Sequence, residues 1–184
     1  MSDMDFYIDV IPEAAHVSRD IHARLLMAAH YCQVKNENVA VAWPDWSVKS
    51  SEFGLIFRVF GGVQALSIYL GQISGLTQNN LVKVPVIKPV PQTTKRHYFY
   101  RDRTVDRGSS ASARARLQRR AIARGEAPKT IEEKPRTGGE HTLFMVSNHR
   151  PSGLIPFHIQ RGLGAECATS SGKEYGLCVS LPDF

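Results

Sequence analysis

Hydrophobic and polar positions follow two different periods over the first half of the chain, which predicts both strands and helices there. Residues 5–12 (DFYIDVIP) alternate the apolar Phe6, Ile8 and Val10 with other side chains, as a half-buried strand does. Residues 12–35 change to a period of about 3.6, which predicts an amphipathic helix. The apolar stripe of this helix consists of Val17, Ile21, Leu25, Ala28 and Cys32.

Over the next fifty or so positions, the same two periods again predict strands and a helix. Residues 38–45 and 54–62 have the pattern of strands, and residues 63–73 that of a short helix. Residues 81–90 predict a last strand, at a sheet edge because it contains prolines. The order β-α-β-β-α-β predicts a ferredoxin-like domain over residues 1–92, within a chain of the α+β class.

The second half, residues 93–184, begins with a polar, basic stretch and continues with a helix and several strands. Residues 92–107 predict a linker or extended arm, and residues 109–124 an arginine-rich helix that ends at Gly125. Ser109, Ser110 and Ser112 are its candidate N-caps. A loop is expected at residues 127–140, and strands at residues 141–148, 154–162, 164–171 and 175–182.

Positive charge is concentrated in one block of the second half. Residues 95–124 hold ten lysines and arginines against two acids, a net charge of +8, whereas the whole chain of 184 residues carries +6. The remainder therefore carries −2. A block this one-sided indicates a polyanionic partner, nucleic acid or an acidic membrane surface, more than a solvated charged face.

The arginine-rich helix favours RNA among these partners. Arg116, Arg119, Arg120 and Arg124 share one side of the helix, and repel one another unless phosphates face them. A single helix without a helix-turn-helix partner or a zipper is a poor reader of DNA. An RNA hairpin opens its major groove near the loop or the stem end, so we expect an RNA stem-loop.

Other classes of protein have little support in the sequence. Three cysteines without CxxC spacing predict a reducing cytoplasm, and neither a signal peptide nor a membrane span is expected. The chain lacks a Walker loop, an HExxH motif and histidines at metal spacing, so we expect no metal and no cofactor.

Two histidines, a serine and a tyrosine stand out as candidates for chemistry, each with an ordinary structural alternative. His30 lies away from the apolar stripe of its helix, so it is either a surface histidine or a catalytic one. Ser147 and His149 end a predicted strand, where simple turn chemistry would also place them. Tyr175 would by default be an aromatic residue at a strand end.

Taken in order, these features resemble the type I-F CRISPR RNA-processing endoribonuclease family over essentially the whole chain. The resemblance includes the histidine late in the first helix, the sequence AVAWPDW, the basic arm and an arginine helix of ARLQRR type. It ends with a strand that closes on a serine and with a C-terminal YGL…F. This family binds the hairpin of the CRISPR repeat, cuts at the base of the stem and stays bound to its product.

The resemblance implies roles for particular residues. His30 matches the catalytic histidine, Ser147 the serine that holds the attacking 2′-hydroxyl, and Tyr175 the tyrosine that positions the histidine. Val105 departs from the family, where a glutamine reads an adenine, and a longer loop makes Ser152 a rival of Ser147. The candidate RNA-binding residues, with Arg103 as the arm arginine that reads a guanine, are Arg103, Arg114, Arg116, Arg119, Arg120 and Arg124.

The implied reaction needs no metal, because the 2′-hydroxyl attacks the adjacent phosphorus and leaves a 2′,3′-cyclic phosphate. The implied partners are CRISPR repeat RNA, the mature crRNA and other subunits of a type I-F crRNA-guided surveillance complex. One alternative is a non-catalytic hairpin-binding subunit that caps a ribonucleoprotein, which would not need His30, Ser147 and Tyr175 together. A basic DNA-binding regulator is a weaker alternative.

Overall fold

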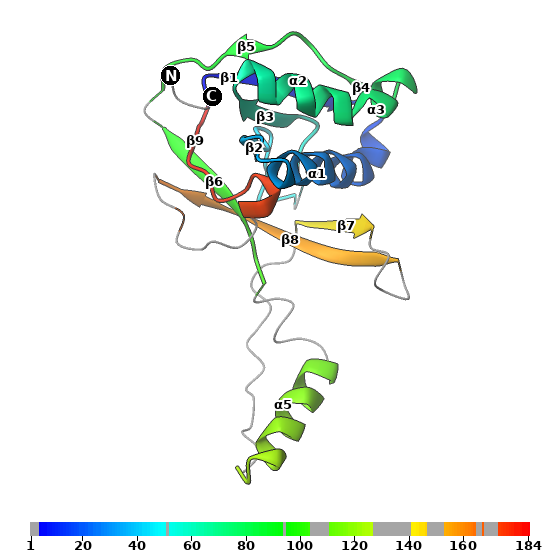
Figure 1. Cartoon of the computed structure of the whole chain (residues 1–184), viewed down its shortest axis with the longest axis vertical. Helices are drawn as coiled ribbons and strands as arrows, with labels where there is room; N and C mark the ends of the chain where they lie inside the picture. Colours follow the sequence, from blue (N-terminus) through cyan, green and yellow to red (C-terminus); the bar gives the residue numbers. More distant parts are fainter. Residues whose placement is uncertain are drawn as a thin grey trace.

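The computed structural model shows a mixed α+β protein with two antiparallel sheets and a few helices (Figure 1). It describes residues 4–50, 52–93, 95–103, 111–126, 141–146, 153–164, 167 and 173–184. The predicted loop at residues 127–140 and nearly all of the predicted strand at residues 164–171 lie outside this described part.

The first sheet is built around β1 (Phe6–Pro12). The predicted alternation holds at Ile8 and Val10, which are buried on either side of the half-buried Asp9, but Tyr7 is buried as well and Phe6 is only half-buried. β1 pairs with β3 (Phe57–Gly61), and β3 pairs with β2 (Val39–Ala42). The predicted last strand forms as two short pieces, β4 (Val82–Lys83) and β5 (Lys88–Pro89), which both pair with β1. All pairs are antiparallel, and the main path runs β2-β3-β1-β4.

Helices cover this sheet. The helix predicted at residues 12–35 begins later than expected: Ala15–Val17 form a 3-10 turn, η1, and helix α1 runs over Ser18–Val34. The stripe residues within α1 are buried, whereas Val17, in η1, is half-buried. Helix α2 (Val63–Gln72) confirms the second predicted helix, and the short helix α3 (Ser74–Gln78) was not predicted. α1 lies against β2 on one side and against the second sheet on the other (Figure 1). The buried side chains of α1 are Ile21, His22, Ala23, Leu25, Leu26, Ala28, Ala29 and Cys32.

The second sheet has the order β7-β8-β6-β9. Its longest strand is β8 (Leu154–Leu163), which pairs antiparallel with β7 (Thr142–Val146) and with β6 (Arg96–Arg101). β6 also pairs with β9 (Leu181–Pro182). Strands from both ends of the second half therefore meet in one sheet.

The strand β6 corrects the prediction that residues 92–107 are a linker or arm. His97 and Phe99 are buried and alternate with exposed or half-buried neighbours such as Arg96 and Tyr98. This is the period of two of a half-buried strand, but the basic side chains on the solvent side hide it in the sequence. The other described residues of this segment, at positions 92, 93, 95, 102 and 103, belong to no strand or helix, so the linker prediction is not contradicted there.

The predicted strand at residues 175–182 is also wrong over most of its length. Lys173–Tyr175 form a 3-10 turn, η2, and only Leu181–Pro182 join the sheet. Gly176 and Cys178 have φ values of 74° and 62°, which break an extended chain twice. The segment therefore turns back between the two sheets instead of running along one of them.

Aromatic side chains join the two sheets into one core. Trp43, fully buried just after β2, meets Phe99 of β6 edge to face at 5.0 Å between ring centroids. Trp46 meets the same ring at 5.2 Å and stacks on His141 at 3.5 Å. The imidazole Nε2 of His141 lies 2.9 Å from the backbone oxygen of Ser47. These contacts place the AVAWPDW segment between the two sheets.

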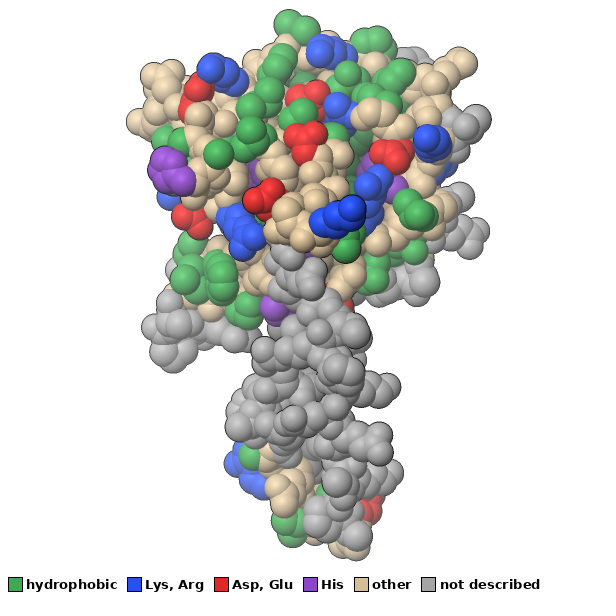
Figure 2. All heavy atoms as spheres, turned by 180° about the vertical axis from the view of Figure 1, so that it is seen from behind, with side chains coloured by type: hydrophobic (Ala, Val, Ile, Leu, Met, Phe, Trp, Pro, Cys, Tyr) green, Lys and Arg blue, Asp and Glu red, His purple; other side chains and the backbone are tan. Residues whose placement is uncertain are grey.

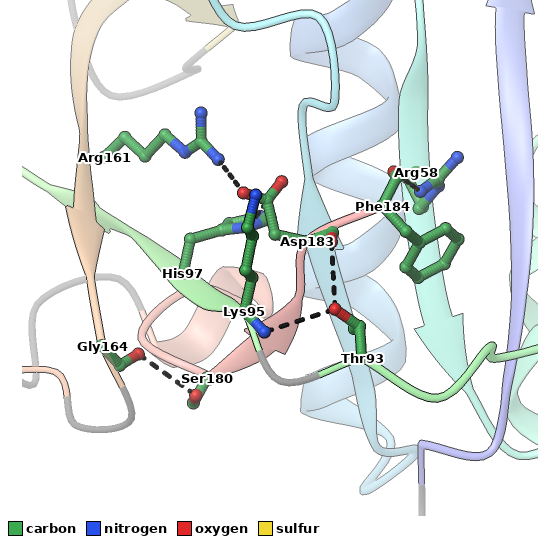
Figure 3. A network of polar contacts seen from close by, with 9 residues as sticks. All are labelled: Arg58, Thr93, Lys95, His97, Arg161, Gly164, Ser180, Asp183 and Phe184. Atoms are coloured by element: carbon green, nitrogen blue, oxygen red, sulfur yellow. Dashed lines mark hydrogen bonds and ion pairs between the residues drawn. The ribbon is translucent and has the colours of Figure 1, made fainter.

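A polar network holds the last residues across both sheets (Figure 3). The guanidinium of Arg161 donates to the Asp183 carboxylate at 3.0 Å, and Thr93 donates to the Asp183 backbone oxygen at 3.4 Å. On the first sheet, Arg58 donates to the backbone oxygen of Phe184 at 2.8 Å and pairs with Asp9 at 2.7 Å. The chain after η2 is therefore fixed at both of its ends.

Candidate active site

His30 lies in the last turns of α1, half-buried, with its ring directed at η2. Its Nδ1 is 2.6 Å from the backbone oxygen of Glu174. A carbonyl oxygen only accepts hydrogen bonds, so Nδ1 carries the hydrogen in this arrangement. The lone pair of the neutral ring is therefore on Nε2, which makes Nε2 the atom that can accept a proton.

Tyr175 packs directly on His30. The two rings are stacked, with 4.5 Å between their centroids and 23° between their planes. On its other side, Tyr175 meets Phe157 of β8 edge to face at 4.8 Å. The predicted pair of His30 and Tyr175 is thus brought together, and a strand of the second sheet supports the tyrosine from behind.

The backbone after η2 fixes these contacts. The N–H of Val41 in β2 donates to the Gly176 oxygen at 3.0 Å, and the N–H of Cys178 donates to the Phe99 oxygen in β6 at 2.7 Å. Gly176 has a φ of 74°, and a Cβ atom there would lie 2.8 Å from the backbone oxygen of Val39. Only glycine fits this close approach without strain. The two hydrogen bonds connect the turn after Tyr175 to a strand of each sheet.

Arg103, the predicted guanine-reading residue, meets the same turn. Its Nη2 lies 3.4 Å from Oε1 of Glu174, and the two side chains are 46% and 43% exposed. Glu174 therefore contacts His30 through its backbone and Arg103 through its carboxylate. Sequence reasoning missed Glu174, because these contacts join residues 144 and 71 positions apart.

Ser147 lies outside the described residues, as do His149 and Ser152. The structure describes the strand before it: β7 ends at Val146 and packs against α1, the helix that carries His30. The assignment of Ser147, and its rivalry with Ser152, stays a prediction.

The arginine-rich segment forms helix α5 (Ala111–Ala123), which lies apart from both sheets in Figure 1. Gly125 has a φ of 69°, and Glu126 donates its N–H to the Ala121 oxygen at 2.9 Å, which confirms the predicted helix stop. Ser109 and Ser110 lie outside the described residues, so these two candidate N-caps stay untested; Ser112 falls within the helix instead.

The described arginines of α5 face solvent. Arg119, Arg120 and Arg124 are exposed, and Arg124 pairs with Glu126 at 3.2 Å. Figure 2 shows Lys and Arg side chains at the end of the extension that carries this helix. The side chains of Arg114 and Arg116 lie outside the described part of the chain. The helix itself holds no acidic residue, so its exposed surface attracts anions.

A second histidine, His97, is buried but belongs to the core. Burial, and after it the positive charge of Arg161, lower its pKa to about 4, although Asp183, whose Oδ1 lies 3.4 Å from Nδ1, acts in the opposite direction. Its ring meets Phe99 edge to face at 5.2 Å. His97 is therefore a neutral packing residue at physiological pH and lies outside the candidate site.

Comparison with known proteins agrees with these features. The sequence model of the family described as CRISPR-associated protein (Cas_Csy4) matches residues 6–182, and the chain belongs to this family of type I-F precursor crRNA-processing proteins. No curated protein matches the chain. Among the described helices, none is both long and apolar enough to cross a membrane.

Proposed function

We propose that the protein is an endoribonuclease that binds the stem-loop of CRISPR repeat RNA, cuts at the base of the stem and stays bound to the mature crRNA. Family membership supports CRISPR RNA processing in general. The observation that carries the catalytic part is the contact of His30 with the Glu174 backbone and the Tyr175 ring. A protein that only binds RNA has no need to orient an imidazole in this way.

The proposed reaction is an in-line attack of a ribose 2′-oxygen on the adjacent phosphorus. The P–O5′ bond breaks, so the products carry a 2′,3′-cyclic phosphate and a 5′-hydroxyl. His30 takes the 2′-hydroxyl proton on Nε2, since Nδ1 already donates to the Glu174 backbone oxygen. General-base catalysis of this kind typically accelerates a reaction by about 10²–10⁴-fold. The departing 5′-oxygen takes a proton from the imidazolium or from water.

The other site residues position the reacting groups. Tyr175 stacks on the imidazole and restricts its rotation, and Ser147 holds the ribose so that the nucleophile and phosphorus are aligned. Because the nucleophile belongs to the substrate and the base is an imidazole, the mechanism requires no metal ion. These assignments rest on the family resemblance together with the geometry of the described residues.

RNA binding is assigned to the arginine side chains. Guanidinium groups make forked hydrogen bonds to phosphate oxygens and guanine edges, and α5 presents several of them on an acid-free helix. Arg103 lies beside the candidate site, where it can contact RNA near the cut. We further propose that other subunits of a type I-F surveillance complex surround the bound crRNA, and that the protein acts in the cytoplasm.

We also infer that the first sheet and its helices form a ferredoxin-like domain. The support is the order β2-β3-β1-β4, with every pair antiparallel and α1 and α2 following β1 and β3. The division of the chain at residue 92 into this domain and an RNA-binding half stays a prediction.

The test is cleavage of an end-labelled type I-F CRISPR repeat RNA in EDTA, with analysis of the product ends. Wild-type protein should yield a cyclic phosphate, and RNA with a 2′-deoxy sugar at the cut should bind without being cut. His30→Ala should abolish cleavage while hairpin affinity stays within a few-fold. Binding without cleavage by the wild type would favour the hairpin-binding subunit instead, and cleavage by His30→Ala at the wild-type rate would overturn the assignment of the base.

A further inference from the structure

Glu174 contacts both the proposed catalytic base, His30, and the proposed RNA-binding residue Arg103. Its backbone oxygen is 2.6 Å from His30, while its carboxylate is 3.4 Å from the guanidinium of Arg103. Both contacts come from η2, and the residues that follow it, Gly176 and Cys178, are hydrogen-bonded to β2 and β6. An RNA acceptor that binds the guanidinium of Arg103 would have to compete with this carboxylate.

The chemistry of this pair makes it a competitor for RNA. A guanidinium presents its N–H donors in a planar fork, and a carboxylate, a phosphate and the O6/N7 edge of guanine all fit that fork. Arg103 cannot make its full set of bonds to RNA while Glu174 holds it. Since both side chains are nearly half exposed, solvent and ligand can reach the pair, and separating it costs little.

We propose that Glu174 is a built-in counter-ion of Arg103 that RNA displaces, so that Arg103 contributes to binding only when the RNA offers a stronger acceptor beside the cut site. This inference rests on the proposed function, because it assigns Arg103 to RNA. Glu174 thereby lowers the affinity of the free protein for RNA that offers only weak acceptors at this position. The carboxylate takes no part in the chemical step, whereas the backbone oxygen of the same residue orients His30.

The test is a double-mutant cycle on affinity for a type I-F repeat hairpin with a 2′-deoxy sugar at the cut, which prevents cleavage. Wild type, Glu174→Gln, Arg103→Ala and the double variant are compared at low salt. Exposed ion pairs are worth at most about 1 kcal/mol, so Glu174→Gln should tighten binding by up to about 5-fold. In the Arg103→Ala background the same substitution should change affinity by less than about 1.5-fold, because the guanidinium through which Glu174 affects RNA binding is absent.

A matched control separates this effect from the loss of a negative charge in general. Glu13 pairs with Lys83 at 2.9 Å on the first sheet, also with exposed side chains, and Glu13→Gln should leave the affinity unchanged. If Glu174 had only a structural role, replacing it would weaken RNA binding, which is the opposite of the change expected here. The proposal is overturned if Glu174→Gln fails to tighten binding, or tightens it equally without Arg103. If the wild type does not bind the hairpin at all, the proposed function itself fails.

Discussion

The turn at Gly176 offers a sharp test of how the active site is held. Gly176→Ala places a Cβ atom 2.8 Å from the Val39 oxygen and 3.2 Å from the Ala40 Cα, and both are backbone atoms that cannot rotate away. The residue also has a φ of 74°, and this left-handed conformation costs a non-glycine residue about 1–2 kcal/mol. The turn must therefore shift, which weakens the 3.0 Å hydrogen bond from Val41, a bond with a net value of about 0.5–1.5 kcal/mol.

Together these effects should lower the free energy of unfolding by about 1.5–3.5 kcal/mol. For a chain of this size, 1 kcal/mol moves the melting temperature by about 2–4 °C, so the melting temperature should fall by about 3–14 °C. The same shift moves Tyr175 and the Glu174 oxygen relative to His30. A displacement of about 1 Å in a catalytic group can cost about 10²-fold, so single-turnover cleavage should slow by that order while hairpin affinity stays near the wild-type value.

Gly71→Ala is the matched control for this experiment. Gly71 lies in α2, and a Cβ atom there would meet nothing within 4 Å. Alanine in a helix is more favourable than glycine by about 0.5–1 kcal/mol, so this variant should be neutral or slightly more stable. The reasoning about the turn is refuted if Gly176→Ala melts and cleaves like the wild type, or if both variants lose the same stability.

Three further predictions concern RNA binding, alignment of the substrate and pH. Replacing Arg116, Arg119 and Arg120 together by alanine should weaken hairpin binding by about 1–3 kcal/mol per strong contact and flatten its salt dependence; an unchanged salt slope would exclude α5 as the RNA-binding element. Ser147→Ala should slow single-turnover cleavage by about 10²-fold without changing the Kd, and to a greater extent than alanine at positions 149 or 152. Burial lowers the pKa of His97 from 6.5 to about 4, so the unfolded chain binds the proton first and the free energy of unfolding should fall as the pH drops from 6.5 toward 4, by up to about 3 kcal/mol. His97→Phe should reduce this slope and leave the part that comes from His22, whose pKa burial also lowers to about 4; an identical slope in both proteins would refute the lowered pKa of His97.

Periodicity predicts most of the first half of the fold, because most of its elements, with the exception of the short helix α3, have a local signal. The stripe of α1 and the alternation in β1 are visible without any tertiary contact, and the position of His30 off that stripe correctly indicates a side chain outside the core. The second half is harder to predict. In β6 the alternation of His97 and Phe99 is present, but charged neighbours make the segment resemble an arm.

Contacts between distant segments were beyond the reach of sequence patterns. Nothing local in the sequence around Glu174 indicates that its backbone meets a helix 144 positions earlier. The positive φ at Cys178 also has no signal in the sequence, since a cysteine in a strand-like run of residues predicts an extended chain. The resemblance to a known family identified Tyr175 as a candidate, whereas the contacts of Glu174 with His30 and Arg103 are seen only in the structure.

The candidate active site depends on how well the two sheets are joined. His30 belongs to α1 and the first sheet, but both of its described ring contacts come from residues 174 and 175, near the other end of the chain. The position of those residues depends in turn on hydrogen bonds to β2 and β6, two strands that Trp43 and Phe99 join through their 5.0 Å edge-to-face contact. Loosening that aromatic contact would therefore disturb the imidazole without touching any residue that we assign to RNA. We therefore expect Trp43, the fully buried tryptophan of the AVAWPDW segment, to influence the candidate active site through the packing of the two sheets, because no part of its side chain is exposed to a substrate.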